Sequence, residues 1–172
     1  MILSLFRTSA NKHVIDRLHG EIMAAARNPA LYLDCGAFDT FEGRFEIFTL
    51  HAALVLRRLS RLPSPGPEMA QDLSDAVARH FDIMLREFGY ADVSVAKRMK
   101  KLTGAFLGRA RAYDEALGAA DMKVLEETIG RNALAGQGPA APLTAYIRRY
   151  NAMIEASPIE VFSTGPLPSV AV

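Results

Sequence analysis

Residues 40–61 constrain the fold of this chain more than any other segment. Apolar residues recur there at helical spacing and occupy almost every side of the expected helix, with Glu46 and His51 as polar interruptions. A helix that is apolar all round belongs in a core. No run of the sequence alternates apolar and polar residues as a half-buried strand does. The pattern therefore predicts an all-α protein whose other helices surround this one.

Amphipathic segments on both sides of residues 40–61 predict the remaining helices. Breakers and caps separate them: Asn28-Pro29, the three prolines of residues 63–67, Gly89, and Asp92 or Ser94. The expected helices cover residues 11–27, 40–61, 68–88, 94–118, 121–135 and 142–156. We therefore expect one compact domain of about six helices over residues 11–157, an N-terminal arm of residues 1–10, and an extended or disordered tail of residues 158–172.

Composition excludes several classes of protein. The chain has 172 residues, which is long enough for a self-sufficient core. Its net charge is +1, so the chain has no overall field that would recruit nucleic acid or lipid. Its one cysteine, Cys35, excludes an intramolecular disulfide and a cysteine-based zinc site. The histidines lack metal-ligand spacing, and neither a phosphate-binding glycine loop nor a serine-hydrolase elbow is present. We expect a protein that is not an enzyme and that needs neither cofactor nor metal.

The apolar run of residues 45–56 is shorter than the roughly twenty residues that cross a bilayer. We therefore expect a cytoplasmic protein, or one peripheral to the inner membrane. The methionines, Met23 and Met84 among them, are expected mainly to fill gaps in the core.

Charged residues crowd the start of the expected central helix, around Asp39, Arg44 and Glu46. Gly43 lies among them, inside the helix, at a cost of about 1 kcal/mol relative to alanine. Something should therefore approach its backbone closely. A capping network with a helix packed on the glycine and a direct role in recognition both account for the pattern, and the two do not exclude each other.

Residues 93–113 carry six cations and no acidic residue, next to a predominantly acidic segment. Most of these cations fall away from the apolar seam of their helix, so they either form a solvated face or meet a partner. An acidic protein surface, anionic lipid headgroups and ribosomal RNA are the candidate partners. Small residues around Gly104 and Gly108 leave a thin stretch that another helix of this chain, or of a client, could approach.

Residues 39–51 and 93–114, taken in order, resemble the signature of the ubiquinol-cytochrome c chaperone family, and the resemblance extends over roughly residues 14–117. It implies a binding protein that assists assembly of the ubiquinol-cytochrome c reductase complex by handling newly made cytochrome b, without covalent chemistry. Because the mitochondrial members carry a longer N-terminal region, we expect a bacterial member.

The resemblance also implies which residues contact the partner. They are Asp39, Gly43, Arg44, Phe45, Glu46, His51, Lys97, Arg98, Lys101, Phe106, Arg109 and Tyr113, of which Phe45, Phe106 and Tyr113 are the first candidates for core positions. The alternative function is a peripheral adaptor that uses its basic helix to bind the ribosome or the inner-membrane surface. A homo-oligomer is a further candidate assembly.

Overall fold

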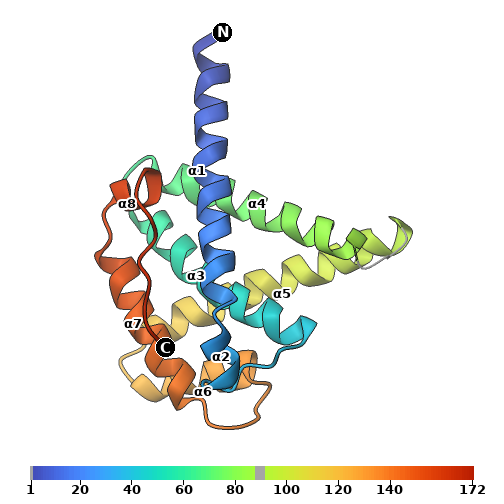
Figure 1. Ribbon diagram of the computed structural model, residues 1–172, viewed down its shortest axis with the longest axis vertical. Coiled ribbons are helices and arrows are strands. Elements are labelled where there is room, and N and C mark those ends of the chain that lie inside the picture. Colours follow the sequence, from blue (N-terminus) through green and yellow to red (C-terminus); the bar gives the residue numbers. More distant parts are fainter. Residues whose placement is uncertain (1, 88–91) are drawn as a thin grey trace.

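A computed structural model describes the backbone of residues 2–87 and 92–172 and the side chains of residues 11–86 and 95–172. This part of the chain forms eight helices and no strand (Figure 1). The long helices are α1 (Ile2–Ala26), α3 (Phe41–Arg61), α4 (Gly66–Glu87), α5 (Asp92–Gly118), α6 (Met122–Ala133) and α7 (Ala141–Ala156). Two short helices, α2 (Pro29–Leu33) and α8 (Ile159–Ser163), complete the set. The all-α prediction is confirmed.

Helix α3 passes through the middle of the molecule and contacts α1, α4, α5, α6 and α7 (Figure 1). Its N-cap is Thr40, whose Oγ1 accepts a hydrogen bond of 3.1 Å from the Gly43 amide. Leu50 and Ala52 are two residues apart and so point to opposite sides of the helix, and neither has any exposed area. The prediction of a buried central helix is therefore correct.

One hydrophobic core joins all eight helices. Fully buried side chains come from the first helix, from the short α2 and from the last helix, as Leu18, Leu31 and Phe162 illustrate. Because every helix contributes to the same cluster, the described chain folds around a single core.

One boundary that the structure describes differs from the sequence prediction. Helix α1 begins at Ile2, well before the expected start near Asn11. The expected helix end at Gly89 lies outside the described residues. Among the described helices, none is both long and apolar enough to cross a membrane.

The prediction of an extended or disordered tail is wrong for residues 159–163, which form α8. Phe162 of α8 is completely buried. Arg17 of α1 donates a hydrogen bond of 2.6 Å to the Phe162 carbonyl, and the Leu167 amide donates one of 2.8 Å to Glu21. The prolines suggested disorder, but an aromatic anchor and polar contacts with α1 order the segment, which then runs along α7 (Figure 1).

Candidate functional site: an apolar groove at the start of α3

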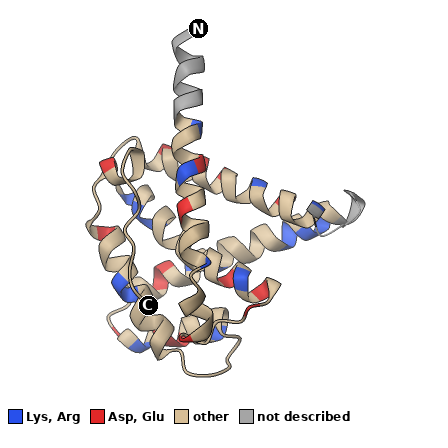
Figure 2. Cartoon of the chain, in the orientation of Figure 1, with Lys and Arg blue, Asp and Glu red and all other residues tan. Residues whose placement is uncertain are grey.

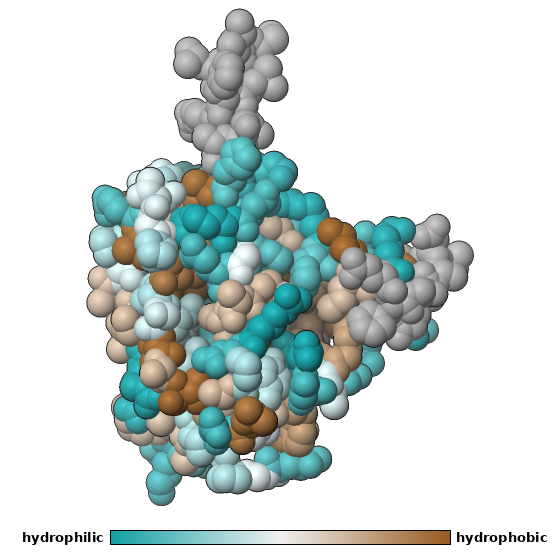
Figure 3. All heavy atoms as spheres, in the orientation of Figure 1, coloured by the Kyte–Doolittle hydropathy of each residue, from teal (hydrophilic) through white to brown (hydrophobic). Residues whose placement is uncertain are grey.

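A groove of about 630 Å³ lies where the end of α1, α2, the start of α3 and the second half of α4 meet. This volume falls in the range of preformed binding sites. The space-filling view shows tan and brown apolar surface interrupting the hydrophilic exterior (Figure 3). The lining residues are Met23, Ala26, Arg27, Tyr32, Asp39, Thr40, Phe41, Arg44, Phe45, Phe48, His80, Phe81, Ile83 and Met84.

Aromatic side chains stiffen one part of this lining. The rings of Phe45 and Phe81 have centroids 5.4 Å apart, and those of Phe81 and Phe106 are 5.8 Å apart. Phe81 thus links the groove to the core between α4 and α5. Ile83, by contrast, is 54% exposed although it is a large aliphatic residue, so the groove offers both a rigid wall and an uncovered apolar contact.

Charged residues lie at the rim of the groove. Arg44 Nε is 2.5 Å from Asp39 Oδ1, and the two side chains are 58% and 61% exposed. The hydrogen bond from Arg44 holds the pKa of Asp39 below its usual range. The Tyr32 hydroxyl donates a hydrogen bond of 2.8 Å to the Ala26 carbonyl. Asp39, Arg44 and Phe45, all expected partner contacts, therefore lie together at this groove.

Gly43 is explained by the loop that precedes α3. A Cβ built on Gly43 would lie 2.1 Å from the carbonyl oxygen of Phe38. The close approach expected at this glycine therefore comes from the chain's own loop rather than from a packed helix. The Thr40 cap and the glycine together let residues 38–40 fold back over the helix start.

Glu46 and Arg109 pair with each other across α3 and α5. Arg109 Nε lies 3.1 Å from Glu46 Oε2, and the Glu46 side chain is only 14% exposed. Burial raises the pKa of Glu46, and the hydrogen bond and charge of Arg109 oppose that shift. Tyr113 is fully buried nearby, and its pKa is raised first by burial and then by the Glu46 carboxylate. These three expected contact residues hold α3 against α5.

His51 is completely buried between α3 and α7. Its Nδ1 is 2.8 Å from the Ile47 carbonyl oxygen, and its Nε2 is 3.0 Å from the Tyr146 hydroxyl. Because a carbonyl only accepts, Nδ1 carries the proton and Nε2 accepts from Tyr146. Burial lowers the pKa of His51 to about 4, so the imidazole is neutral near pH 7 and serves the packing of these helices.

The basic residues of α5 fall into two groups, one exposed at the outer end of the helix and one paired with carboxylates of the same chain. Lys97, Arg98 and Lys101 are exposed toward the outer end of the helix, where Figure 2 shows blue residues gathered. Arg109 turns toward α3, as described, and Arg111 Nε pairs with Glu115 at 2.8 Å. The basic face defined by Lys97, Arg98, Lys100 and Lys101 is therefore shorter than the sequence predicted.

Two small residues of α5, Gly104 and Gly108, lie on its open side, whereas Ala105 and Ala110 pack against the core. A Cβ built on Gly104 or Gly108 would meet no atom within 4 Å, beyond the helix itself and its immediate neighbours. Within the described chain, no other helix packs on these two glycines. Leu107 lies between the two glycines and is 56% exposed.

Comparison with known proteins places this architecture. The family model of the ubiquinol-cytochrome C chaperone matches residues 33–170. The chain belongs to that family. The crystal structure of the Cbp3 homolog from Brucella abortus is similar, with 34% sequence identity, a TM-score of 0.86, and coverage of 99% of this chain and 97% of that chain. None of the curated proteins matches the chain significantly.

The family match begins at residue 33, later than the residue 14 that the resemblance suggested, but it continues beyond residue 117 and includes α6, α7 and α8. It favours assistance to assembly of ubiquinol-cytochrome c reductase as the general role of this chaperone. The same match covers residues 159–170, the segment that contains α8 and that we expected to be extended or disordered.

Sequence reasoning missed two features of the chaperone. The groove was missed because four separate segments form it; Met23 and Met84 pack against the core, as expected, and also line the groove. The available signal was Ile83, an apolar residue beside the buried stripe of α4. The second feature is Arg57, whose side chain is 12% exposed and lies 2.8 Å from Asp114 of α5. Arg57 also pairs with Glu155 of α7, so it ties three helices together.

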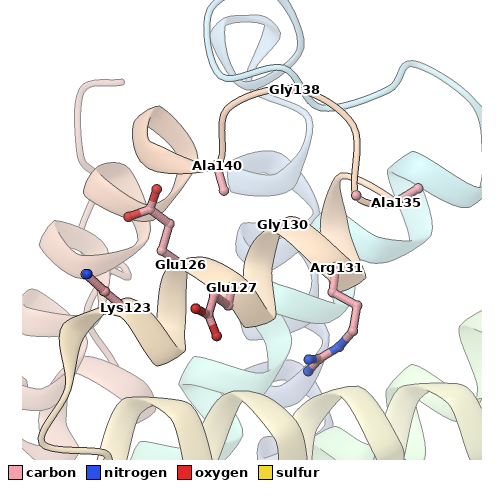
Figure 4. Close-up of a pocket in the computed structure, with 9 residues that line it drawn as sticks. Lys123, Glu126, Glu127, Gly130, Arg131, Ala135, Gly138 and Ala140 are labelled. Carbon is pink, nitrogen blue, oxygen red and sulfur yellow. The ribbon is translucent and has the colours of Figure 1, made fainter.

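A second hollow, of about 640 Å³, lies beside α6 and the loop that follows it. Figure 4 shows Glu126, Glu127 and Arg131 projecting from α6, while the loop through Gly138 arches over Gly130. Charges of both signs mix along this open surface. It lacks the apolar lining of the groove, which we therefore take as the candidate site.

Proposed function

We propose that this chaperone holds an apolar segment of newly made cytochrome b in the groove between α1, α3 and α4, and that it does so without covalent chemistry. The observation that carries the proposal is an open apolar groove, about 630 Å³ in volume, that keeps Ile83 54% exposed. Exposed apolar surface of this kind commonly marks an interaction site. A chaperone that acts in the cytoplasm, at the surface of the inner membrane, would be close to a client that is a membrane protein.

The side chains around the groove suit a client that is not yet folded. Met23 and Met84 are flexible and polarisable, and such residues adapt to varied apolar partners. Phe45 and Phe81 supply a rigid surface behind them. Adaptable and rigid contacts together favour temporary binding of an apolar segment over recognition of one fixed shape.

The experiment is affinity capture of the tagged chaperone from its native membranes after gentle crosslinking. Ile83→Glu places a charge in the groove, and Met122→Glu is the matched control because Met122 is 52% exposed but lies on α6, outside the groove lining. We expect cytochrome b with the wild type and with Met122→Glu, and at least a severalfold loss with Ile83→Glu. Equal recovery with both variants would exclude the groove. Absence of cytochrome b from the wild-type sample would refute the client itself.

The exposed Lys97, Lys100 and Lys101 favour a second candidate function, that of an adaptor docking on the ribosome or on anionic lipid. The Lys97→Glu, Lys101→Glu double variant tests it. If ribosomes or anionic vesicles bind the wild type but not this variant, and binding falls steeply with salt, the adaptor function gains support. Binding that ignores both salt and charge reversal would reject it.

A further inference from the structure

We infer that the groove selects apolar segments that carry a carboxylate, and that Arg27 and Arg44 bind this carboxylate at the rim beside Tyr32. The inference rests on the proposed function and deepens it, because it specifies the chemistry of the client segment. The experiment below separates failure of this inference from failure of the proposed function.

The distribution of charge over the groove is the first argument. Its lining includes two arginines and one carboxylate, with Met23, Phe41, Ile83 and Met84 among its apolar members. Arg27, Asp39 and Arg44 line the same groove as Tyr32. The rim therefore carries a net positive charge next to apolar walls. A segment with both an apolar body and an acidic residue complements both parts.

The weakness of the Asp39–Arg44 pair is the second argument. Both side chains are more than half exposed, at 61% and 58%, and an ion pair exposed in this way contributes little to stability because solvent screens it. A client carboxylate can therefore replace Asp39 at little cost. A guanidinium can also bind a carboxylate through two parallel hydrogen bonds, which Asp39 does not make here, since only Nε contacts it.

Arg27 is the third argument. It lines the groove and is exposed, and within the described part of the chain no carboxylate forms an ion pair with it. An incoming carboxylate thus meets one cation that is already available and a second that is held loosely.

The test uses fluorescein-labelled amphipathic peptides of leucine, alanine and glutamine with blocked termini. The peptides form two pairs, and the two members of a pair differ only in having Glu or Gln at one position. That position is near the N-terminus in one pair and near the C-terminus in the other. Binding is followed by fluorescence anisotropy. We expect one Glu peptide to bind about fivefold more tightly than its Gln partner at low ionic strength, with the preference mostly lost in about 0.5 M salt. Arg44→Gln should weaken the preference, the Arg27→Gln, Arg44→Gln double variant should abolish it, and Asp39→Asn should strengthen it.

Arg111→Gln is the control, because it removes the same charge from an exposed position outside the groove. It should leave the preference unchanged. If the Glu and Gln peptides bind with equal affinity and Ile83→Glu binds neither, the carboxylate inference is overturned, and the groove remains a binding site for apolar segments in general. A preference that survives the Arg27→Gln, Arg44→Gln double variant would also overturn it. If no peptide binds, the groove fails as a client site altogether.

Discussion

Gly43 has the closest neighbour of all the glycines that the structure describes. The Cβ of alanine would collide with the Phe38 backbone at 2.1 Å, so the loop before α3 would have to move. We expect Gly43→Ala to lower the free energy of unfolding by about 2–4 kcal/mol, as overpacking against backbone does. Urea denaturation followed by circular dichroism measures this change.

Gly104→Ala is the matched control for Gly43→Ala. Both glycines lie in helices, but a Cβ on Gly104 meets open space. Alanine there should raise the free energy of unfolding by about 0.5–1 kcal/mol, because it restricts the unfolded chain. Destabilisation of similar size in the two variants would show that the close approach of Phe38 is not what requires glycine at position 43.

His51 makes stability depend on pH in a defined direction. Its pKa falls from the ordinary 6.5 to about 4 in the folded chain, so between these values the unfolded chain binds a proton that the native chain does not. The stability contribution is therefore complete above about pH 6.5 and is lost as pH falls toward 4, by up to about 3 kcal/mol. His51→Gln should be less stable at pH 7 and should lose less stability on acidification.

Chemical denaturation at a series of pH values checks this expectation, with His13→Gln as the control at an exposed histidine. The carboxylates of the chain titrate in all three proteins, so only the difference in slope reports on His51. An identical slope in wild type and His51→Gln would mean that the buried imidazole is protonated as readily as a free one.

At the scale of the element, α8 shows how a short segment becomes ordered. Five residues cannot hold a helix alone, yet Phe162 is fully buried in the common core. We expect Phe162→Ala to lower the free energy of unfolding by about 3–5 kcal/mol. Glu160→Ala, at an exposed position of the same helix, should change it little. A small effect of Phe162→Ala in urea denaturation would indicate that α8 detaches without disturbing the core.

At the scale of the whole molecule, one core should produce one unfolding transition. Buried tyrosines report on different parts of it, since Tyr113 belongs to α5, whereas Tyr146 and Tyr150 belong to α7. We expect tyrosine near-ultraviolet signals and helical far-ultraviolet signals to change at the same urea concentration. Separate midpoints would show that the chain unfolds in more than one cooperative unit.

The sequence by itself determined the helical class, the six long helices and the central position of α3. These follow from local periodicity, because residues three and four apart share one face of a helix whatever it packs against. The family resemblance likewise depended on residues close in sequence. Asp39 and Arg44 are five positions apart, so the sequence alone places both at the start of α3, where they form an ion pair.

Only the tertiary structure decided which residues meet across elements. It paired Glu46 of α3 with Arg109 of α5. It buried Phe162 in a tail whose prolines indicated disorder, and it assembled the groove from four segments, with Ile83 uncovered. The physical reason is that such contacts depend on how helices cross and on what each leaves uncovered, and a local pattern carries neither quantity.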